Sequence, residues 1–415
     1  MGLKITVIIV AVVGFAYSLF LSVIERRSIS NPTPDNLKDV YDNETYERWK
    51  KYTAEHVKLD IVFKAISSLV SIAMLCTNAY ALFASLFPKQ VALQILSVIL
   101  LESVVDAVFT VIKSWISTMK IEEKYGFNRT NKKTFVFDQV RSFLLGFALS
   151  CAISFLILGL YGWLGGWMVV LFVAVMFAFT TLISFIYPLL SRIGNKFTPL
   201  EEGELKDSLT ALLNKHNYQV KAIEVMDASR RTTKLNAYFT GFGKMKTIVL
   251  YDNLVNAMTV KEICAVFAHE LGHGIHKDVL KNQLFSILSY TVMGLTALLL
   301  VKFPAFYSQF GFSEINYGFT FILLGILLNL IQPLLSLITN ANSRKAEYKA
   351  DDQAVIEGYG EEMISAFKKL AKENFANLAP SKLNVLLEYS HPPLNLRIEN
   401  VRKTTKKLNE NKQTK

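Results

Sequence analysis

The chain has 415 residues, a length that would indicate two or three domains in a soluble protein. Hydrophobic residues make up 52% of it, Phe alone contributes 29 residues, and only 19% of the residues are charged, against about a quarter in a typical globular protein. This composition excludes a disordered chain, and three cysteines are too few for a disulfide framework.

Seven stretches are apolar enough and long enough, at about 20 residues, to cross a lipid bilayer as helices. They lie at roughly 3–24, 61–87, 91–117, 142–162, 167–190, 284–301 and 317–339. The apolar run of the first stretch is too long for a secretory signal peptide, so we interpret it as a membrane anchor. The sequence therefore predicts a mainly α-helical integral membrane protein with seven transmembrane helices.

The basic residues indicate which side of the membrane the polar segments face. Of the 45 Lys and Arg residues, 40 fall in the segments 25–60, 118–141, 191–283 and 340–415, all on one side of the membrane. Because cytosolic loops carry the excess of Lys and Arg, we expect these segments and the C-terminus in the cytosol, and the N-terminus outside or in a lumen. This distribution accounts for the net charge of +11 without a nucleic-acid partner, and leaves the lipid bilayer as the expected partner.

The polar segments divide the chain into four parts. Residues 1–190 form a membrane region of five helices with cytosolic loops at 25–60 and 118–141, and residues 284–339 supply helices six and seven. The polar segments 191–283 and 340–415 are each too small to be an obvious domain. We expect them to form one small domain assembled across the last two spans.

The third predicted span carries three charged residues, Glu102, Asp106 and Lys113. At 100° per residue they lie within about 40° of one another, on one helix face. Charges inside a span face a bundle interior or a water-filled cavity. The face therefore either forms an internal ion pair or lines an aqueous chamber.

The clearest chemical motif is HExxH at residues 269–273. On a helix, His269 and His273 project from the same side, one turn apart, with Glu270 beside them. Two imidazoles in this arrangement bind zinc, and the glutamate takes a proton from water. Charged residues bracket the motif, so its helix is at most peripheral to the bilayer, which argues against a protease that cuts inside the membrane.

A catalytic zinc needs a third protein ligand. The pattern HExxHxxGxxH does not supply it, since His276 stands at the Gly position and Val279 at the third His position. The first acidic helical pattern after the last span contains Glu347 and Asp351, four residues apart. Glu347 would complete a His/His/Glu set and Asp351 would hold the free ring N–H of a zinc histidine. The alternative for this segment is an exposed charged helix.

Several motifs along nearly the whole chain resemble the type I CaaX prenyl protease family, that of the yeast a-factor-converting enzyme. Besides FAHELGHGIHKD and SRKAEYKAD, these motifs are YERWKKY from residue 46, IEEKYGFNRT from 121, NKFTPL from 195, NAYFTGFGKMKTIVLYD from 236 and SHPPLNLRI from 390. The resemblance implies a helical barrel around a large chamber. A gluzincin-type zinc metalloprotease domain with a small β-sheet would cap it.

Roles for individual residues follow from the resemblance. It implies one zinc ion held by His269, His273 and Glu347, Glu270 as general base, and Asp351 as support for a ligand. Asn236 would contact the backbone of the substrate beside an edge strand. His391 and Arg397 would hydrogen-bond the substrate and the developing oxyanion, whereas the residues HPP alone indicate only a helix start, at which His391 would be a cap.

The expected function is that of a membrane-embedded zinc metalloendopeptidase. Its substrate would be a prenylated CaaX tail or another membrane-associated peptide or protein. One alternative is a general quality-control protease for membrane proteins without a prenyl requirement, and another is a non-catalytic transporter or scaffold with structural zinc. The compact chain favours a bacterial member in a cell membrane, with the endoplasmic reticulum membrane as the alternative.

Overall fold

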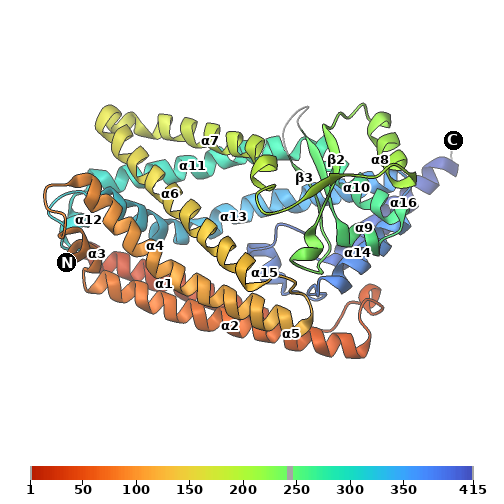
Figure 1. Ribbon diagram of the computed structural model, residues 1–415, viewed down its shortest axis with the longest axis horizontal. Helices are drawn as coiled ribbons and strands as arrows, with labels where there is room; N and C mark the ends of the chain where they lie inside the picture. Colours follow the sequence, from red (N-terminus) through yellow and green to blue (C-terminus); the bar gives the residue numbers. More distant parts are fainter. Residues whose placement is uncertain (1, 241–245, 414–415) are drawn as a thin grey trace.

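The computed structural model describes residues 2–240 and 246–413, so that part of the NAYFTGFGKMKTIVLYD motif lies outside these ranges. Long helices occupy the end of the molecule that carries the N-terminus, and a small sheet with shorter helices occupies the end that carries the C-terminus (Figure 1). The long helices are α1 (Gly2–Ser28), α2 (Asn43–Cys76), α4 (Val91–Ile116), α6 (Lys132–Leu164), α7 (Met168–Leu190), α11 (Asp278–Lys302) and α13 (Tyr317–Ile356).

Six segments of the described chain are long and apolar enough to cross a membrane. One of them, Lys132–Leu189, is made of α6 and α7, which the 3₁₀ turn η3 (Gly165–Trp167) joins. Six of the seven predicted spans therefore lie within helical segments, and the count of seven holds when α6 and α7 are counted separately. The span predicted at 61–87 ends too late, because α2 stops at Cys76 and a turn separates it from the short helix α3. Short elements connect the long helices: η1 (Asp35–Leu37), α3 (Ala79–Ala84), a π-helical turn η2 (Ser117–Glu122), α5 (Glu123–Tyr125) and α12 (Ala305–Ser308).

Two helices extend well beyond the predicted spans. Helix α2 begins at Asn43, where Asp42 accepts a hydrogen bond from the backbone N–H of Thr45, so much of the predicted loop 25–60 is helical. Helix α13 continues past the predicted end at residue 339 to Ile356. Hydropathy detects only the apolar part of a helix, and residues 340–356 include four Ala residues, which favour a helix, among charged and amide side chains, which disfavour a membrane span.

A cavity of about 880 Å³ lies between the long helices, lined mainly by α1, α2, α4 and α13. Glu102 and Asp106 both line it, and Glu102 accepts a hydrogen bond of 2.6 Å from Tyr80. Lys113 instead forms an ion pair of 2.7 Å with Asp60 of α2. Both interpretations of this charged face therefore hold in part, because two of its residues face the chamber and the third ties two helices together.

The polar end of the molecule is built from a four-stranded sheet and helices. The strands are β1 (Phe197–Pro199), β2 (Ala222–Met226), β3 (Ala237–Thr240) and β4 (Thr247–Tyr251), in the order β1-β2-β4-β3, with β2 and β4 parallel and the other pairs antiparallel. The remaining elements are α8 (Glu204–Lys215), η4 (Ala228–Arg230), α9 (Asp252–Ala257), α10 (Val260–Ile275), α14 (Gly360–Glu373), α15 (Lys382–Leu387) and α16 (Leu394–Gln413).

Helix α10 lies at the centre of this polar end, between two hydrophobic clusters. Ile263 and Phe267 belong to the cluster formed with the sheet and α8. Ala265 and Ala268 belong to the cluster formed with the end of α13, α14 and α16. Because both faces of α10 are packed, the side chains that it carries are held in fixed positions.

Candidate metal centre and active site

The HExxH motif lies on α10, as its spacing predicts. Thr259 and Glu262 form a reciprocal capping box that starts this helix nearly three turns before the motif. His269 is buried, His273 is partly buried, and their ring centroids are 4.8 Å apart. The helical period alone therefore brings the two imidazoles together.

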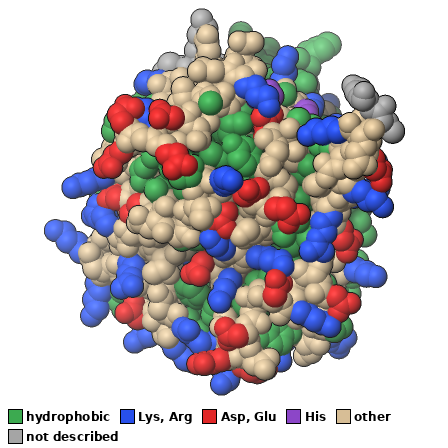
Figure 2. Space-filling view, turned by 90° about the vertical axis from the view of Figure 1, so that its right-hand side faces the viewer, with side chains coloured by type: hydrophobic (Ala, Val, Ile, Leu, Met, Phe, Trp, Pro, Cys, Tyr) green, Lys and Arg blue, Asp and Glu red, His purple; other side chains and the backbone are tan. Residues whose placement is uncertain are grey.

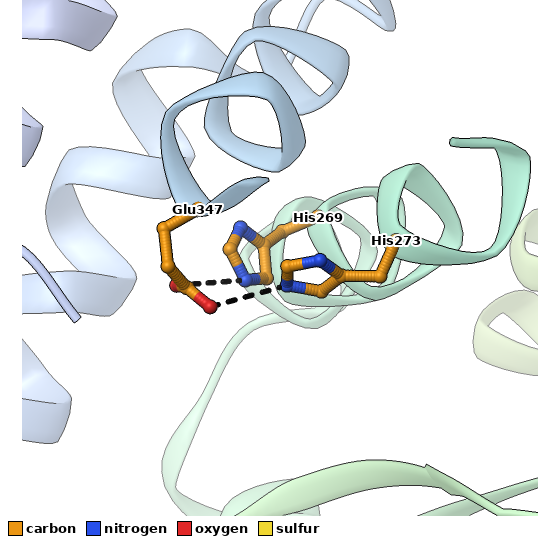
Figure 3. A group of neighbouring side chains, drawn as sticks. All are labelled: His269, His273 and Glu347. Carbon is orange, nitrogen blue, oxygen red and sulfur yellow. Dashed lines mark ion pairs between the residues drawn. The ribbon is translucent and has the colours of Figure 1, made fainter. Parts of the chain in front are cut away.

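Glu347 approaches the two histidines from α13 (Figure 3). Its Oε1 lies 3.3 Å from Nε2 of His273 and its Oε2 lies 3.6 Å from Nε2 of His269. One nitrogen of each histidine and one oxygen of Glu347 all lie within 4.8 Å of one another. The structure thus brings together the three residues that the sequence analysis expects as zinc ligands.

The close approach of α13 depends on Gly272. A Cβ atom at this position would lie 2.9 Å from Cα of Ala350 and 3.0 Å from Cβ of Gln353. Real Cβ atoms do not approach backbone atoms so closely, so a larger residue would push the two helices apart. The small residue between the histidines therefore sets the distance between the helix with two ligands and the helix with the third.

The far ring nitrogens of both histidines are held by carboxylates. Nδ1 of His269 lies 2.9 Å from Oδ1 of Asp351, and Nδ1 of His273 lies 3.1 Å from Oδ2 of Asp278. A proton on each Nδ1, donated to its carboxylate, leaves Nε2 with a free lone pair directed at Glu347. Asp351 is fully buried and Asp278 is buried, so both partners are fixed.

This arrangement fits a divalent cation. Oε2 of Glu347 is buried and accepts no hydrogen bond among the described residues, although Nε2 of His269 and the Arg397 guanidinium both lie near it, so it can still act as a ligand atom. Burial lowers the pKa of His273, but hydrogen bonds to Glu347 and Asp278 outweigh it and raise the pKa to about 9. The surrounding carboxylates therefore stabilise positive charge at this point, and two imidazoles with a carboxylate form a donor set of catalytic zinc sites.

Arg397 lies at the site, against Asp351 and Glu347. Its Nε and one terminal nitrogen donate hydrogen bonds of 2.9 and 2.6 Å to Asp351, and the same terminal nitrogen lies 3.2 Å from Oε2 of Glu347. The guanidinium also stacks 4.3 Å from the ring centroid of Phe367. This bidentate ion pair holds Asp351 in place, and the positive charge of Arg397 balances the negative charges of Asp351 and Glu347.

The other candidate residues lie at different distances from this set. Glu270 is partly buried on α10, and burial raises the pKa of its carboxyl, opposed by the charges of His269 and His273. His391 is 63% exposed, with Nε2 3.3 Å from Oε1 of Glu347. Asn236 lies just before β3, where its backbone carbonyl accepts a hydrogen bond of 3.1 Å from Tyr251 N–H.

Asp278 is a residue of the site that the sequence analysis missed. It is the first residue of α11 and follows Lys277, whose positive φ of 56° turns the chain sharply between α10 and α11. That turn brings Asp278 back beneath His273. The available signal was an aspartate five residues after the second histidine, but spacing without the turn geometry does not place it.

Comparisons with known proteins cover almost the whole chain. The family model described as "CAAX prenyl protease N-terminal, five membrane helices" matches residues 4–192, and "Peptidase family M48" matches residues 199–405. The chain is 29% identical to CAAX prenyl protease 1 of Saccharomyces cerevisiae and 29% identical to the homolog of this protease from Oryza sativa, over 92% of each chain in both cases.

A solved structure gives the same result for the fold. The crystal structure of S. mikatae Ste24p superposes with a TM-score of 0.89 at 26% identity, covering 97% of this chain and 99% of that one. The two matched models leave only short stretches of the chain unassigned, and together they include all seven long helices and the HExxH motif. The chain therefore belongs to peptidase family M48, as a membrane metalloprotease with the N-terminal helices of the CAAX prenyl proteases.

Proposed function

We propose that this protein hydrolyses peptide bonds at one zinc ion held by His269, His273 and Glu347. The observation that carries the proposal is the convergence of the two Nε2 atoms and the Glu347 carboxylate on a single point. When bound there, zinc supplies a Lewis acid that polarises a carbonyl and lowers the pKa of water. Structural zinc sites are usually closed by four protein ligands, so a set of three favours catalysis over the transporter or scaffold alternative.

Three further residues of the site have separate proposed roles. Glu270 lies beside both histidines on α10 and is placed to accept a proton from water and later donate it to the leaving amine. His391 is the exposed imidazole next to Glu347, and we assign it a hydrogen bond to the substrate carbonyl. Arg397 has its donors directed at Asp351, so we assign it the positioning of the ligands rather than contact with substrate.

The substrate that we propose is a prenylated CaaX-type C-terminal tail. The membrane cavity reaches Glu388 and Tyr389, directly before His391 in the chain, so a substrate in the cavity would have access to the candidate site. The strand β3 is the last strand of the sheet, and a free edge can pair with an extended peptide. Asn236, at the start of this strand, would contact the peptide backbone.

The orientation that we propose places the polar end in the cytosol. The face of the molecule at this end carries many Lys and Arg side chains interspersed with Asp and Glu (Figure 2). A cytosolic excess of basic residues is the usual arrangement in membrane proteins. The bilayer and a peptide or protein substrate are then the partners, with no nucleic acid, in a bacterial cell membrane or the endoplasmic reticulum.

The test uses purified protein in liposomes and one CaaX peptide in farnesylated and bare forms, with and without a metal chelator. We expect chelator-sensitive removal of the last three residues that disappears in Glu270→Ala, with preference for the farnesylated peptide. Equal cleavage of both forms would instead support a general protease for membrane-associated polypeptides. Cleavage that persists in Glu270→Ala would contradict the assigned mechanism.

A further inference from the structure

Two of the motifs that carry the family resemblance, YERWKKY and IEEKYGFNRT, have no role in the site described above. The structure brings both of them to residues 231–236, the lead-in segment that directly precedes β3. Backbone hydrogen bonds join this segment to the loop after α5, from Arg129 N–H to the carbonyl of Arg231 at 3.0 Å and from Thr233 N–H to the carbonyl of Phe127 at 3.2 Å. A short antiparallel pairing therefore runs between two distant parts of the chain.

The loop that makes this pairing is fixed to the end of α4. Gly126 has a φ of 82°, a conformation that other residues rarely adopt, and it turns the chain after the π-helical turn η2 and α5. The backbone N–H groups of Phe127 and Asn128 then donate to the carbonyl of Glu122 at 2.8 and 3.3 Å. The position of the loop relative to the membrane helix is thus set by Glu122 and Gly126.

The side chain of Lys234 returns from the lead-in segment to the same turn. Its Nζ donates to Oε1 of Glu122 at 3.0 Å and to the hydroxyl of Tyr52 at 2.9 Å, and Tyr52 in turn donates to Oε1 of Glu122 at 2.6 Å. The ammonium also lies 5.1 Å from the ring centroid of Phe127 and 5.4 Å from that of Tyr52. We call Tyr52, Glu122 and Lys234 the Lys234 clamp.

Leu235, the residue after Lys234, is held by hydrogen bonds from a different part of the chain. The Asn374 side chain accepts from Leu235 N–H at 2.8 Å and donates to the Leu235 carbonyl at 3.0 Å. Phe375 has a positive φ of 52°, a strained conformation for an aromatic residue. Its ring packs at 4.9 Å from Phe127 and 5.5 Å from Tyr52, between centroids, and this packing holds the strained conformation.

We propose that the Lys234 clamp positions β3 as the strand on which substrate binds. Asn236 follows Lys234 by two residues and β3 begins one residue later. A shift of one residue in the pairing of β3 would turn its side chains to the opposite face. An ion pair that fits only one register prevents that shift. The inference rests on the proposed function, because it assumes that a peptide pairs with β3, and it makes Tyr52, Glu122 and Lys234 positioning residues rather than catalytic ones.

The kinetic test compares Lys234→Met, Glu122→Gln and the double variant with wild type on one extended peptide. Met keeps the length of the side chain among the aromatic rings and removes the charge. We expect KM to rise about tenfold while kcat stays within about threefold, because the loss falls on binding rather than on chemistry. The KM of the double variant should be no higher than that of either single variant, because each single change already breaks the same ion pair. Lys234→Arg, which keeps the charge, should restore the wild-type KM.

The matched control is Lys368→Met, which breaks the ion pair of Lys368 with Asp39 away from β3. Hydrogen exchange provides a readout independent of activity. Amides of residues 232–240 should exchange about tenfold faster in Lys234→Met than in wild type, and at the wild-type rate in Lys368→Met. Unchanged exchange or an unchanged KM in Lys234→Met, or an equal rise of KM in Lys368→Met, would each contradict the proposed role of the clamp. The proposed function would be unaffected as long as the wild type cleaves the peptide. A wild-type protein that cleaves no peptide would overturn the proposed function itself, and with it the role of the clamp in substrate binding.

Discussion

Nδ1 of His269 and Oδ1 of Asp351 lie 2.9 Å apart, although 82 positions separate the two residues in the chain. The contact joins α10 to α13, and it fixes the ring so that Nε2 faces Glu347. Arg397 from α16 donates two hydrogen bonds to the same aspartate. Three helices therefore meet at one buried carboxylate, and the geometry of the candidate zinc site depends on it.

Replacing this carboxylate should weaken metal binding. Asp351→Asn keeps the size of the side chain but removes the charge that orients His269 and balances Arg397. We expect zinc affinity to fall about 10- to 100-fold, the usual effect of losing a partner of a ligand histidine. Competition with a chelator measures the change. Asp352→Asn is the control, because Asp352 binds Asn400 and Thr404 instead, and an equal loss there would contradict a specific role for Asp351.

Glu270→Gln should separate catalysis from metal binding. The amide cannot accept a proton from water, so we expect peptide cleavage to fall about 10²- to 10⁴-fold. Zinc content, measured by elemental analysis of the purified protein, should stay near one per chain because Glu270 is not among the assigned ligands. His273→Ala provides the contrast, with both zinc and cleavage lost. Substantial activity in Glu270→Gln would require another proton acceptor.

Gly272→Ala should separate the two helices that carry the ligands. The new methyl group would meet the backbone of Ala350 at 2.9 Å, and overpacking of this kind costs about 1–3 kcal/mol of folding free energy. We expect a lower unfolding temperature together with weaker zinc binding. Gly146→Ala on α6 is the matched control, since a Cβ atom there meets nothing within 4 Å. Normal zinc binding by Gly272→Ala would show that the helices adjust without moving the ligands.

The stability of the polar end should depend on pH through Glu262. Burial alone would raise its pKa, but hydrogen bonds from Lys369, Ser365 and Thr259 outweigh this effect and lower the pKa from 4.5 to about 2. Because the folded pKa lies below the unfolded one, ionised Glu262 stabilises the folded state above pH 4.5. This contribution, on the order of 3 kcal/mol, is lost as the pH falls from 4.5 toward 2.

Thermal unfolding between pH 7 and pH 3 tests this expectation. Wild type should be more stable than Glu262→Gln at pH 7, and the two unfolding temperatures should converge as the solution becomes acidic. Glu361→Gln, which removes an exposed carboxylate from α14, should follow wild type throughout. Parallel curves for wild type and Glu262→Gln would show that the carboxylate is not the source of the acid sensitivity.

The local features of this protein could be predicted from the sequence. Membrane helices depend on the composition of one continuous stretch, and α4 runs from Val91 to Ile116 where the stretch 91–117 was predicted. The pairing of His269 with His273 depends only on the helical period. Glu347 could be predicted as the third ligand because it lies in the first acidic helical pattern after the last span, although its contact with both histidines is a property of the fold.

The tertiary structure decided everything that depends on contacts between distant segments. Asp278 reaches His273 through a turn with a positive φ at Lys277, and Arg397 is directed at Asp351 by the packing of α16 on α13. The same holds for Lys234, whose partners come from α2 and η2. Hydropathy and helical period report on neighbours along the chain, whereas the direction of a polar side chain is set by whichever groups folding brings within hydrogen-bonding distance.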